Sequence, residues 1–301
     1  MVIANLQSLI TIYYLPLTQK EPMPTFPPFP TPARIGLLGV AFDENSSYKR
    51  GSALAPQRIR EAFFCDSSNL WTENETYLGV DGLFADMGDI TPSAERMPIE
   101  TEQAAGQLYE AGLKVMAFGG DHSVTYPLVK AAAKNHPDLT ILHFDAHPDL
   151  YDDFEGNPHS HASPFARIME AGLAKRLVQV GIRTINGHQR EQAKRFGVEV
   201  LTMQRWRDVF DLKFDSPLYI TFDMDCLDPA FAPGISHREP GGLSTREALS
   251  VIQSLHANII GADVVELNPT QDVSDVTEMV AAKVFKEIVA KMLEKLEIGN
   301  W

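Results

Sequence analysis

The sequence predicts an α/β fold, in which a central, mostly parallel sheet lies between two helical layers in a three-layer α/β/α arrangement. After residue 34, short and continuously apolar runs alternate with amphipathic helical stretches. Parallel strands are buried on both faces and therefore read as continuous apolar runs. Polar clusters that follow four of these runs give a second indication, because such sheets bind ligands beyond the carboxyl ends of their strands.

The predicted elements follow from these patterns in chain order. The strands are residues 35–42, 114–120, 139–146, 176–182, 217–223 and 257–267. The helices are residues 55–64, 99–112, 126–135, 161–172, 187–197, 244–256 and 276–296. Pro56 suits a first helical turn, and Ser244 with Glu247 forms a capping-box pattern. The last helix keeps an apolar stripe at helical spacing.

The N-terminal segment differs from the rest of the chain. Residues 21–33 hold six prolines, which favour extended, polyproline-like chain over helix or central strand. We therefore divide the chain into an extension, 1–33, and a single catalytic domain, 34–301. Residues 1–17 are apolar but lack a basic start and a cleavage motif, so we expect an arm that packs on the body or on a neighbouring subunit rather than a signal peptide.

Charge and cysteine content narrow the class of protein. The 301 residues include 26 Lys and Arg against 40 Asp and Glu, a formal net charge of −14. This argues against nucleic acid or an anionic membrane as the main partner. Cys65 and Cys226 lie far apart and form neither a metal motif nor a disulfide framework. A reduced, cytoplasmic setting is the simplest expectation.

The cluster "DAHPD" ends the third apolar run with Asp145, His147 and Asp149. Residues at i, i+2 and i+4 of an extended chain share one side, so these side chains can converge on one point. The alternative is a strand-end turn with a capping Asp and a solvated His. His143 shares the parity but lies deeper in the strand, where a hydrogen-bonded core histidine is the better interpretation.

Two further clusters repeat the pattern. Asp223 and Asp225 follow "LYIT", and two buried carboxylates this close are unfavourable unless cations neutralise them. The alternative is that one of these two carboxylates caps a helix and the other faces water. Asp228 precedes a proline and is expected to form a turn. In "GGDHS", His122 can point inward while Asp121 supports the turn.

Together these clusters supply six candidate metal ligands, namely His122, Asp145, His147, Asp149, Asp223 and Asp225. Zinc in closed structural sites prefers Cys and His, and Mg²⁺ and Ca²⁺ rarely take His. Mixed carboxylates and imidazoles suit Mn²⁺, with Ni²⁺, Co²⁺ or Fe²⁺ as substitutes. Six ligands exceed the need of one ion, so we expect two ions about 3.5–4 Å apart that lower the pKa of a shared water.

These residues give the sequence a resemblance to the ureohydrolase family of arginases and agmatinases. The matching segments are "GGDHS" (119–123), "DAHPD" (145–149), "SHASPFARIME" (160–170), "FDMDCLDPAFAPG" (222–234) and "DVVELNP" (263–269). The resemblance begins near Ile35, extends to the C-terminal helix and is most like the plant-type arginases. It implies a three-layer fold, a trimer or hexamer and a dinuclear manganese centre.

The resemblance also implies individual roles. Asp145 and Asp223 bridge the two ions, His122 and Asp149 complete one, and His147 and Asp225 the other. His161 matches the catalytic acid/base, and Glu266 matches the carboxylate that holds the guanidinium of a small cationic substrate. Without the resemblance, His161 is a histidine at a helix start and Glu266 a carboxylate at a strand end.

Two further candidate substrate-binding residues lie in loops. Arg238 departs from the plant-type pattern, which has an apolar residue or His there. It either pairs with an α-carboxylate at the site mouth or is a solvated loop residue. Asn157 belongs to the loop 150–160, which is expected to line the mouth, and the acidic side chains of this loop either contact a distal amine or are exposed.

The function expected from the sequence is hydrolysis of L-arginine to ornithine and urea. The alternatives within the family are agmatine, converted to putrescine and urea, guanidinobutyrate and free guanidine. A catalytically silent relative is disfavoured because every ligand position is filled. A metal-dependent amide hydrolase, such as a deacetylase on a related sheet, is disfavoured by the "DxHxD" and "ELNP" forms.

Overall fold

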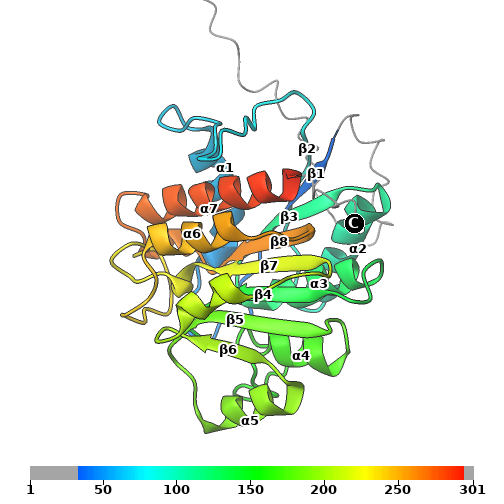
Figure 1. Cartoon of the computed structure of the whole chain (residues 1–301), viewed down its shortest axis with the longest axis vertical. Helices are drawn as coiled ribbons and strands as arrows, with labels where there is room; N and C mark the ends of the chain where they lie inside the picture. The colour runs from blue at the N-terminus through cyan, green and yellow to red at the C-terminus, as the bar shows by residue number, and fades with distance from the viewer. Residues whose placement is uncertain (1–32, 295–301) are drawn as a thin grey trace, which may run out of the picture.

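The sheet of the computed structural model contains eight parallel strands in the order β2-β1-β3-β8-β7-β4-β5-β6 (Figure 1). The structure describes residues 33–294. The strands are β1 (Ile35–Val40), β2 (Phe84–Ile90), β3 (Lys114–Phe118), β4 (Thr140–Phe144), β5 (Arg176–Ile182), β6 (Glu199–Thr202), β7 (Leu218–Asp223) and β8 (Ile259–Val265). The predicted N-terminal extension and its packing lie outside the described residues, apart from residue 33.

Seven α-helices cover the two faces of the sheet. They are α1 (Ala55–Phe64), α2 (Met97–Glu110), α3 (Thr125–Ala133), α4 (Pro164–Glu170), α5 (Gly187–Phe196), α6 (Thr245–Ser254) and α7 (Val276–Leu293) within the described residues. Short 3₁₀ segments are η2 (Ser52–Leu54), η3 (His122–Val124), η4 (Trp206–Asp211), η5 (Met224–Cys226) and η6 (Pro269–Gln271). None of the described helices is long and apolar enough to span a membrane.

Successive strand residues face opposite layers. Met116 and Phe118 of β3 pack in the core that contains α1, α6 and α7. Val115 and Ala117 pack in the other core, which contains α2, α3, α4 and α5. Since both faces of the strand are covered, its sequence is continuously apolar. The predicted three-layer α/β/α fold is confirmed, and all strand pairs in the sheet are parallel.

The sequence analysis missed the two edge strands, β2 and β6. β6 has only four residues, "EVLT", with Glu199 exposed. β2 carries Asp86, which is buried and accepts two hydrogen bonds of 2.9 Å from Arg60. This pairing removes the need for an apolar side chain at that position. Edge strands therefore lack the continuous apolar run that identified the central ones.

A close backbone approach beside β3 makes Gly120 essential. A Cβ built on Gly120 would lie 1.7 Å from Phe42 O, and that carbonyl also accepts the N–H of Asp121 at 2.9 Å. Gly120→Ala is therefore expected to lower stability by about 1–3 kcal/mol and to displace the turn that leads to His122. Denaturant unfolding measures the loss, with Gly106→Ala as control.

The Gly106 control is matched in chemistry but not in surroundings. Gly106 lies inside α2, and a Cβ there would meet no atom within 4 Å. Alanine is favoured over glycine in a helix by about 0.5–1 kcal/mol, so this variant is expected to be neutral or slightly stabilised. Equal stability of the two variants would contradict the assignment of a steric role to Gly120.

Candidate metal centre

The polar clusters predicted from the sequence meet at the carboxyl edge of the sheet. They follow β3, β4, β7 and β8, which are four consecutive strands at the centre of the sheet although they are distant in the sequence. This is where open parallel sheets bind ligands. The structure brings all six predicted ligands together there, five of them buried and one half-buried: His122, Asp145, His147, Asp149, Asp223 and Asp225.

The neutral ring of His122 would turn a nitrogen lone pair toward carboxylates. Its Nε2 lies 3.0 Å from Thr221 Oγ1, and that hydroxyl donates its only proton to Asp263 Oδ1 at 2.6 Å. Thr221 must therefore accept the Nε2 proton, which leaves a lone pair on Nδ1. Three oxygens lie 3.1–3.2 Å from this Nδ1, namely Oδ2 of Asp145, of Asp149 and of Asp223. Four electron-rich atoms face one another, an arrangement that a cation stabilises.

The same arrangement is repeated around His147. Its Nδ1 lies 3.0 Å from Asp225 Oδ2 and 3.4 Å from Asp145 Oδ1. Asp145 thus turns Oδ2 toward His122 and Oδ1 toward His147. Two groups of side chains that fit a metal ion share this carboxylate, one with His122 and His143 and the other with His147 and Asp225. The geometry describes two adjacent cation subsites joined by Asp145.

The electrostatics of the cluster show a demand for positive charge. Burial alone would lower the pKa values of His122 and His147, but the carboxylates around them raise both well above the usual range in the metal-free chain. Burial and the nearby charges of Asp225 and Asp145 raise the pKa of Asp223 well above its usual range. Burial and the charge of Asp145 also raise the pKa of Asp149. A buried group of carboxylates resists ionisation unless positive charge is supplied. Nδ1 of His122 has no hydrogen-bond partner among the described residues, and it marks where that positive charge would lie.

Backbone conformation marks two residues of the site. Asp149 has φ 49° and Glu266 has φ 63°, in the left-handed region that few non-glycine residues adopt. Such conformations cost about 1–3 kcal/mol and persist where the surroundings impose them, often at functional sites. The backbone N–H of Glu266 donates to Gly120 O at 2.8 Å. This hydrogen bond connects the end of β8 to the turn after β3.

Glu266 and His161 form a buried pair beside the cation subsites. His161 Nδ1 lies 2.8 Å from Glu266 Oε1, and the same oxygen accepts the backbone N–H of His122 at 2.9 Å. On the other side of the ring, the backbone N–H of Ser47 donates to Nε2 at 3.1 Å. Nε2 is therefore an acceptor, and the neutral ring carries its proton on Nδ1 and donates it to Glu266.

Glu266 strongly changes the pKa of His161. Burial alone would lower the pKa of His161, but the charge and hydrogen bond of Glu266 raise this pKa to about 9. When the ring is protonated, Nε2 donates to Ser47 Oγ, which lies 2.8 Å away. His161 can thus hold or release a proton at Nε2 with a local partner in either state.

The metal-free chain is expected to lose stability at alkaline pH because of His161. Its pKa is about 9 in the folded chain and about 6.5 in an unfolded one. This stabilisation is fully present below about pH 6.5 and is lost as the pH rises through about 9. His161→Gln is therefore expected to reduce the free energy of unfolding more at about pH 6 than at about pH 10. Denaturant unfolding of both metal-free proteins measures this, and an equal loss at both pH values would contradict it.

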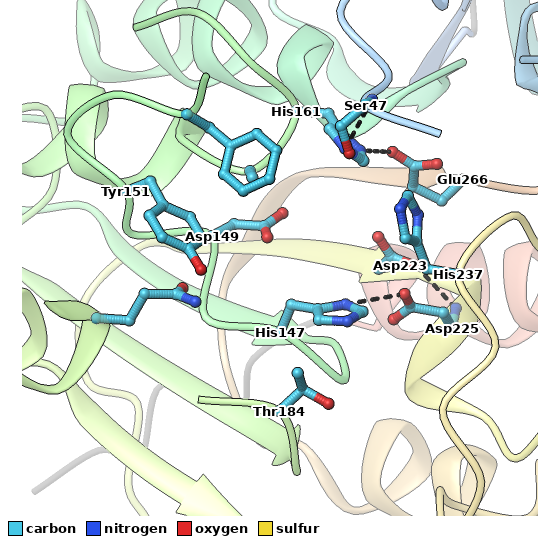
Figure 2. A pocket seen from close by; sticks show the side chains of 13 residues that line it. Ser47, His147, Asp149, Tyr151, His161, Thr184, Asp223, Asp225, His237 and Glu266 are labelled. Atoms are coloured by element: carbon cyan, nitrogen blue, oxygen red, sulfur yellow. Dashed lines mark hydrogen bonds and ion pairs between the residues drawn. The ribbon is translucent and has the colours of Figure 1, made fainter. Parts of the chain in front are cut away.

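A cavity of about 140 Å³ opens onto these groups (Figure 2). Its lining includes His147, Asp149, Asp223 and Asp225 from the cation subsites together with His161 and Glu266. The remaining lining residues are Ser47, Tyr151, Phe154, Ala162, Thr184, Gln189 and His237. The catalytic and metal-binding residues expected from the sequence therefore border one cavity or lie directly beneath it.

His237 is the main lining residue that the sequence analysis missed. Figure 2 shows its ring between Glu266 and the carboxylates of Asp223 and Asp225. Its ring centroid lies 5.2 Å from that of His161 and 6.0 Å from that of His147. Burial and the positive charge of His161 lower its pKa. Its neighbour Arg238 departs from the plant-type pattern, but Arg238 is exposed and His237 lines the cavity.

The two substrate-binding candidates in loops make contacts outside the cavity lining. The guanidinium of Arg238 is exposed and donates to Pro233 O and Gln271 O, which agrees with the alternative of a solvated loop residue. Asn157 Nδ2 donates to Asn45 Oδ1 at 3.2 Å. Neither residue lines the cavity.

The loop 150–160 does line the mouth, through Tyr151 and Phe154 rather than through its acidic residues. Two structural roles assigned from the sequence are confirmed. Asp121 accepts from the backbone N–H of Ser123 and from that of Asn45. Asp228 accepts from the backbone N–H of Ala230 in its own turn and from those of Gly241 and Gly242.

Comparisons with known proteins show which proteins this chain is similar to. The model of the Arginase family matches residues 33–290. The chain is 48% identical over 278 residues to Arginase 1, mitochondrial, of Arabidopsis thaliana, covering 86% of this chain and 81% of that protein. It is 33% identical over 267 residues to the agmatinase of Bacillus anthracis, covering 85% and 91%. The solved arginase from Medicago truncatula aligns with a TM-score of 0.82 at 45% identity, covering 86% of this chain and 87% of that one.

Proposed function

Because this chain belongs to the arginase family of hydrolases, we propose that it converts L-arginine to ornithine and urea at a dinuclear manganese centre. The similarity to plant arginases, at 48% and 45% identity over most of the chain, supports arginine as the substrate. The observation that carries the metal centre is the His122 Nδ1 lone pair, which faces three carboxylate oxygens at 3.1–3.2 Å. Carboxylates mixed with imidazoles suit Mn²⁺ better than Zn²⁺ or Mg²⁺.

Two ions would divide these ligands. His122 and Asp149 would hold one ion and His147 and Asp225 the other. Asp145 would be shared because its two oxygens face the two histidines, and Asp223 would be shared as the resemblance implies. When bound, such ions lower the pKa of water and thereby supply a nucleophile near neutral pH. The chain contributes the rigid placement of the ligands, because each follows a central strand.

Glu266 would orient the guanidinium at the cavity floor. Its Oε1 is already held by the His122 N–H and by His161, so the carboxylate plane is fixed before substrate arrives. The remaining acceptor positions suit a planar cation that donates paired N–H groups. Fixing the guanidinium beside the cation subsites lowers the entropic part of the barrier.

His161 would deliver the proton that the departing amine requires. An amine leaves poorly unless it is protonated, and a histidine positioned at the site suits this transfer. The pKa of His161 is raised to about 9 in the metal-free chain, so the ring readily holds a proton beside Glu266. Its Nε2 faces Ser47, and both residues line the cavity.

One observation favours agmatine as the second candidate substrate. No Lys or Arg is among the described residues that line the cavity, so an α-carboxylate would meet neutral donors such as Tyr151, Thr184 and Gln189. Tyr151 OH already accepts from Asn186 Nδ2 at 2.7 Å, which leaves its own proton free to donate. Agmatine lacks the carboxylate and needs no such partner.

The test is a comparison of four guanidino compounds. Metal-stripped protein is reloaded with Mn²⁺ or Ni²⁺, and urea is measured from arginine, agmatine, guanidinobutyrate and guanidine. We expect the highest kcat/KM with arginine and Mn²⁺. A clear preference for another compound would replace the substrate, and a preference for free guanidine would make nickel the ion to examine. Absence of urea from all four would overturn the proposal in favour of a silent relative or an amide hydrolase.

Assembly and compartment remain proposals from the sequence. We propose a homo-trimer or hexamer, which light scattering of the purified full chain measures directly.

We also propose that the enzyme is cytoplasmic. This proposal rests on the two cysteines, both of them free. The Arabidopsis thaliana relative is described as mitochondrial, so fractionation of cells that express the full chain is the deciding measurement.

A further inference from the structure

His143 makes specific contacts that exceed those of an ordinary core histidine. The side chain lies in β4 and is completely buried. Its Nε2 lies 2.7 Å from Asp145 Oδ2, and its Nδ1 lies 3.1 Å from Gln179 Nε2 on the neighbouring strand β5. The ring stacks on Phe165 with centroids 3.9 Å apart. The imidazole thus connects a second strand to the carboxylate shared by both cation subsites.

The hydrogen-bond partners determine which ring nitrogen carries the proton. Gln179 Nε2 also donates to Pro148 O at 2.6 Å, and a carbonyl oxygen only accepts, so the amide orientation is fixed. The second N–H of the same amide must then donate to His143 Nδ1. The proton of the neutral ring is consequently on Nε2, and His143 donates to Asp145 instead of offering a lone pair to a metal ion.

The hydrogen bond from His143 helps to fix the orientation of the Asp145 carboxylate. Oδ1 accepts the backbone N–H of His147 at 2.5 Å, and Oδ2 accepts from His143. With one donor on each oxygen, the carboxylate cannot rotate freely. Its remaining lone pairs stay directed at the two subsites, where Oδ2 lies 3.2 Å from His122 Nδ1 and Oδ1 lies 3.4 Å from His147 Nδ1.

We propose that His143, held in one tautomer by Gln179, is a positioning residue that fixes Asp145 for metal binding. The inference rests on the proposed metal centre and adds to it a pair of residues outside the ligand set. Partners of this kind, which hydrogen-bond to a metal ligand, typically change metal affinity by about 10–100-fold when removed. Because His143 contacts Oδ2, the effect is directed at the His122 subsite.

His143→Phe is the principal test. Phenylalanine keeps a ring that can stack on Phe165 but has no nitrogen to donate to Asp145. Mn²⁺ dissociation constants are measured by competition with a chelating indicator, and bound metal is counted by elemental analysis. We expect affinity to fall about tenfold or more. His136→Phe is the matched control, because His136 is half-buried at the far end of α3 and its replacement should leave Mn²⁺ affinity unchanged.

Gln179→Leu provides the second variant, which also covers a failure of His143→Phe to fold. It removes the donor that fixes the tautomer, so Mn²⁺ affinity should fall in the same direction. If Gln179 acts through His143, the leucine change will cost less affinity in a His143→Phe background than in the native chain. In a His147→Asn background, which leaves the His122 subsite intact, His143→Phe should still weaken the remaining ion.

The outcomes separate this inference from the function itself. Native affinity for Mn²⁺ in His143→Phe, or in Gln179→Leu if the first variant does not fold, would overturn the positioning role while leaving the metal centre in place. Equal costs of Gln179→Leu in both backgrounds would remove Gln179 from the proposal. A native chain that binds no Mn²⁺ would overturn both the inference and the metal centre.

Discussion

Replacing Asp145 with alanine is expected to abolish urea formation and to remove both metal ions together. The two oxygens of this carboxylate face different histidines, His122 at 3.2 Å and His147 at 3.4 Å. One substitution therefore disrupts both subsites. It also leaves the buried Nε2 of His143 without its acceptor, which adds a cost in stability.

The comparison with His147→Ala makes the expectation specific. His147 faces Asp225 Oδ2 and Asp145 Oδ1, whereas the other oxygen of Asp145 faces His122, so loss of His147 should weaken one ion and leave the other. Elemental analysis after dialysis counts the ions, and urea release from arginine gives the activity. Asp138→Ala, at an exposed position after α3, serves as the control. Two ions retained by Asp145→Ala would be incompatible with a shared carboxylate.

The central fold was predictable because it depends on a single physical property. Strands such as β4 and β7 are covered on both faces, so residues 139–146 and 217–223 are mostly apolar. The same reasoning fails at the margins of the sheet. Asp86 in β2 is buried against Arg60, and a side chain satisfied by a distant partner leaves no local pattern in the sequence.

The metal ligands were predictable for a related reason. Each lies within a few residues of a strand end, so the rule that carboxyl ends share one edge brings them together without knowledge of the loops. His237 and Ser47 lie in loops instead, and their positions depend on tertiary contacts such as Ser236 Oγ donating to Lys49 O. The role of His143 was likewise hidden, since Gln179 lies 36 residues away in the chain.

Replacing His161 with alanine is expected to lower turnover by about 10²–10⁴-fold while metal content stays the same. None of the contacts described for the two cation subsites includes His161, so the ions keep their ligands. Turnover falls because no other group holds a proton between Ser47 and Glu266. His159→Ala is the control, since His159 is exposed two residues away.

A Ser47→Ala variant distinguishes a role of His161 in proton transfer from a role in shaping the cavity. The backbone N–H of Ser47 donates to Nε2 at 3.1 Å, and this contact survives in Ser47→Ala, whereas the hydroxyl contact at 2.8 Å does not. Since the hydroxyl accepts only from the protonated ring, its loss should lower the kinetic pKa of His161 and shift the alkaline limb of the pH profile to lower pH. Turnover near neutral pH should change little by comparison with His161→Ala.

Each variant has an outcome that would contradict the proposed role. A His161→Ala enzyme with native turnover would show that the proton reaches the amine by another route. An unchanged pH profile in Ser47→Ala would assign the hydroxyl to packing alone.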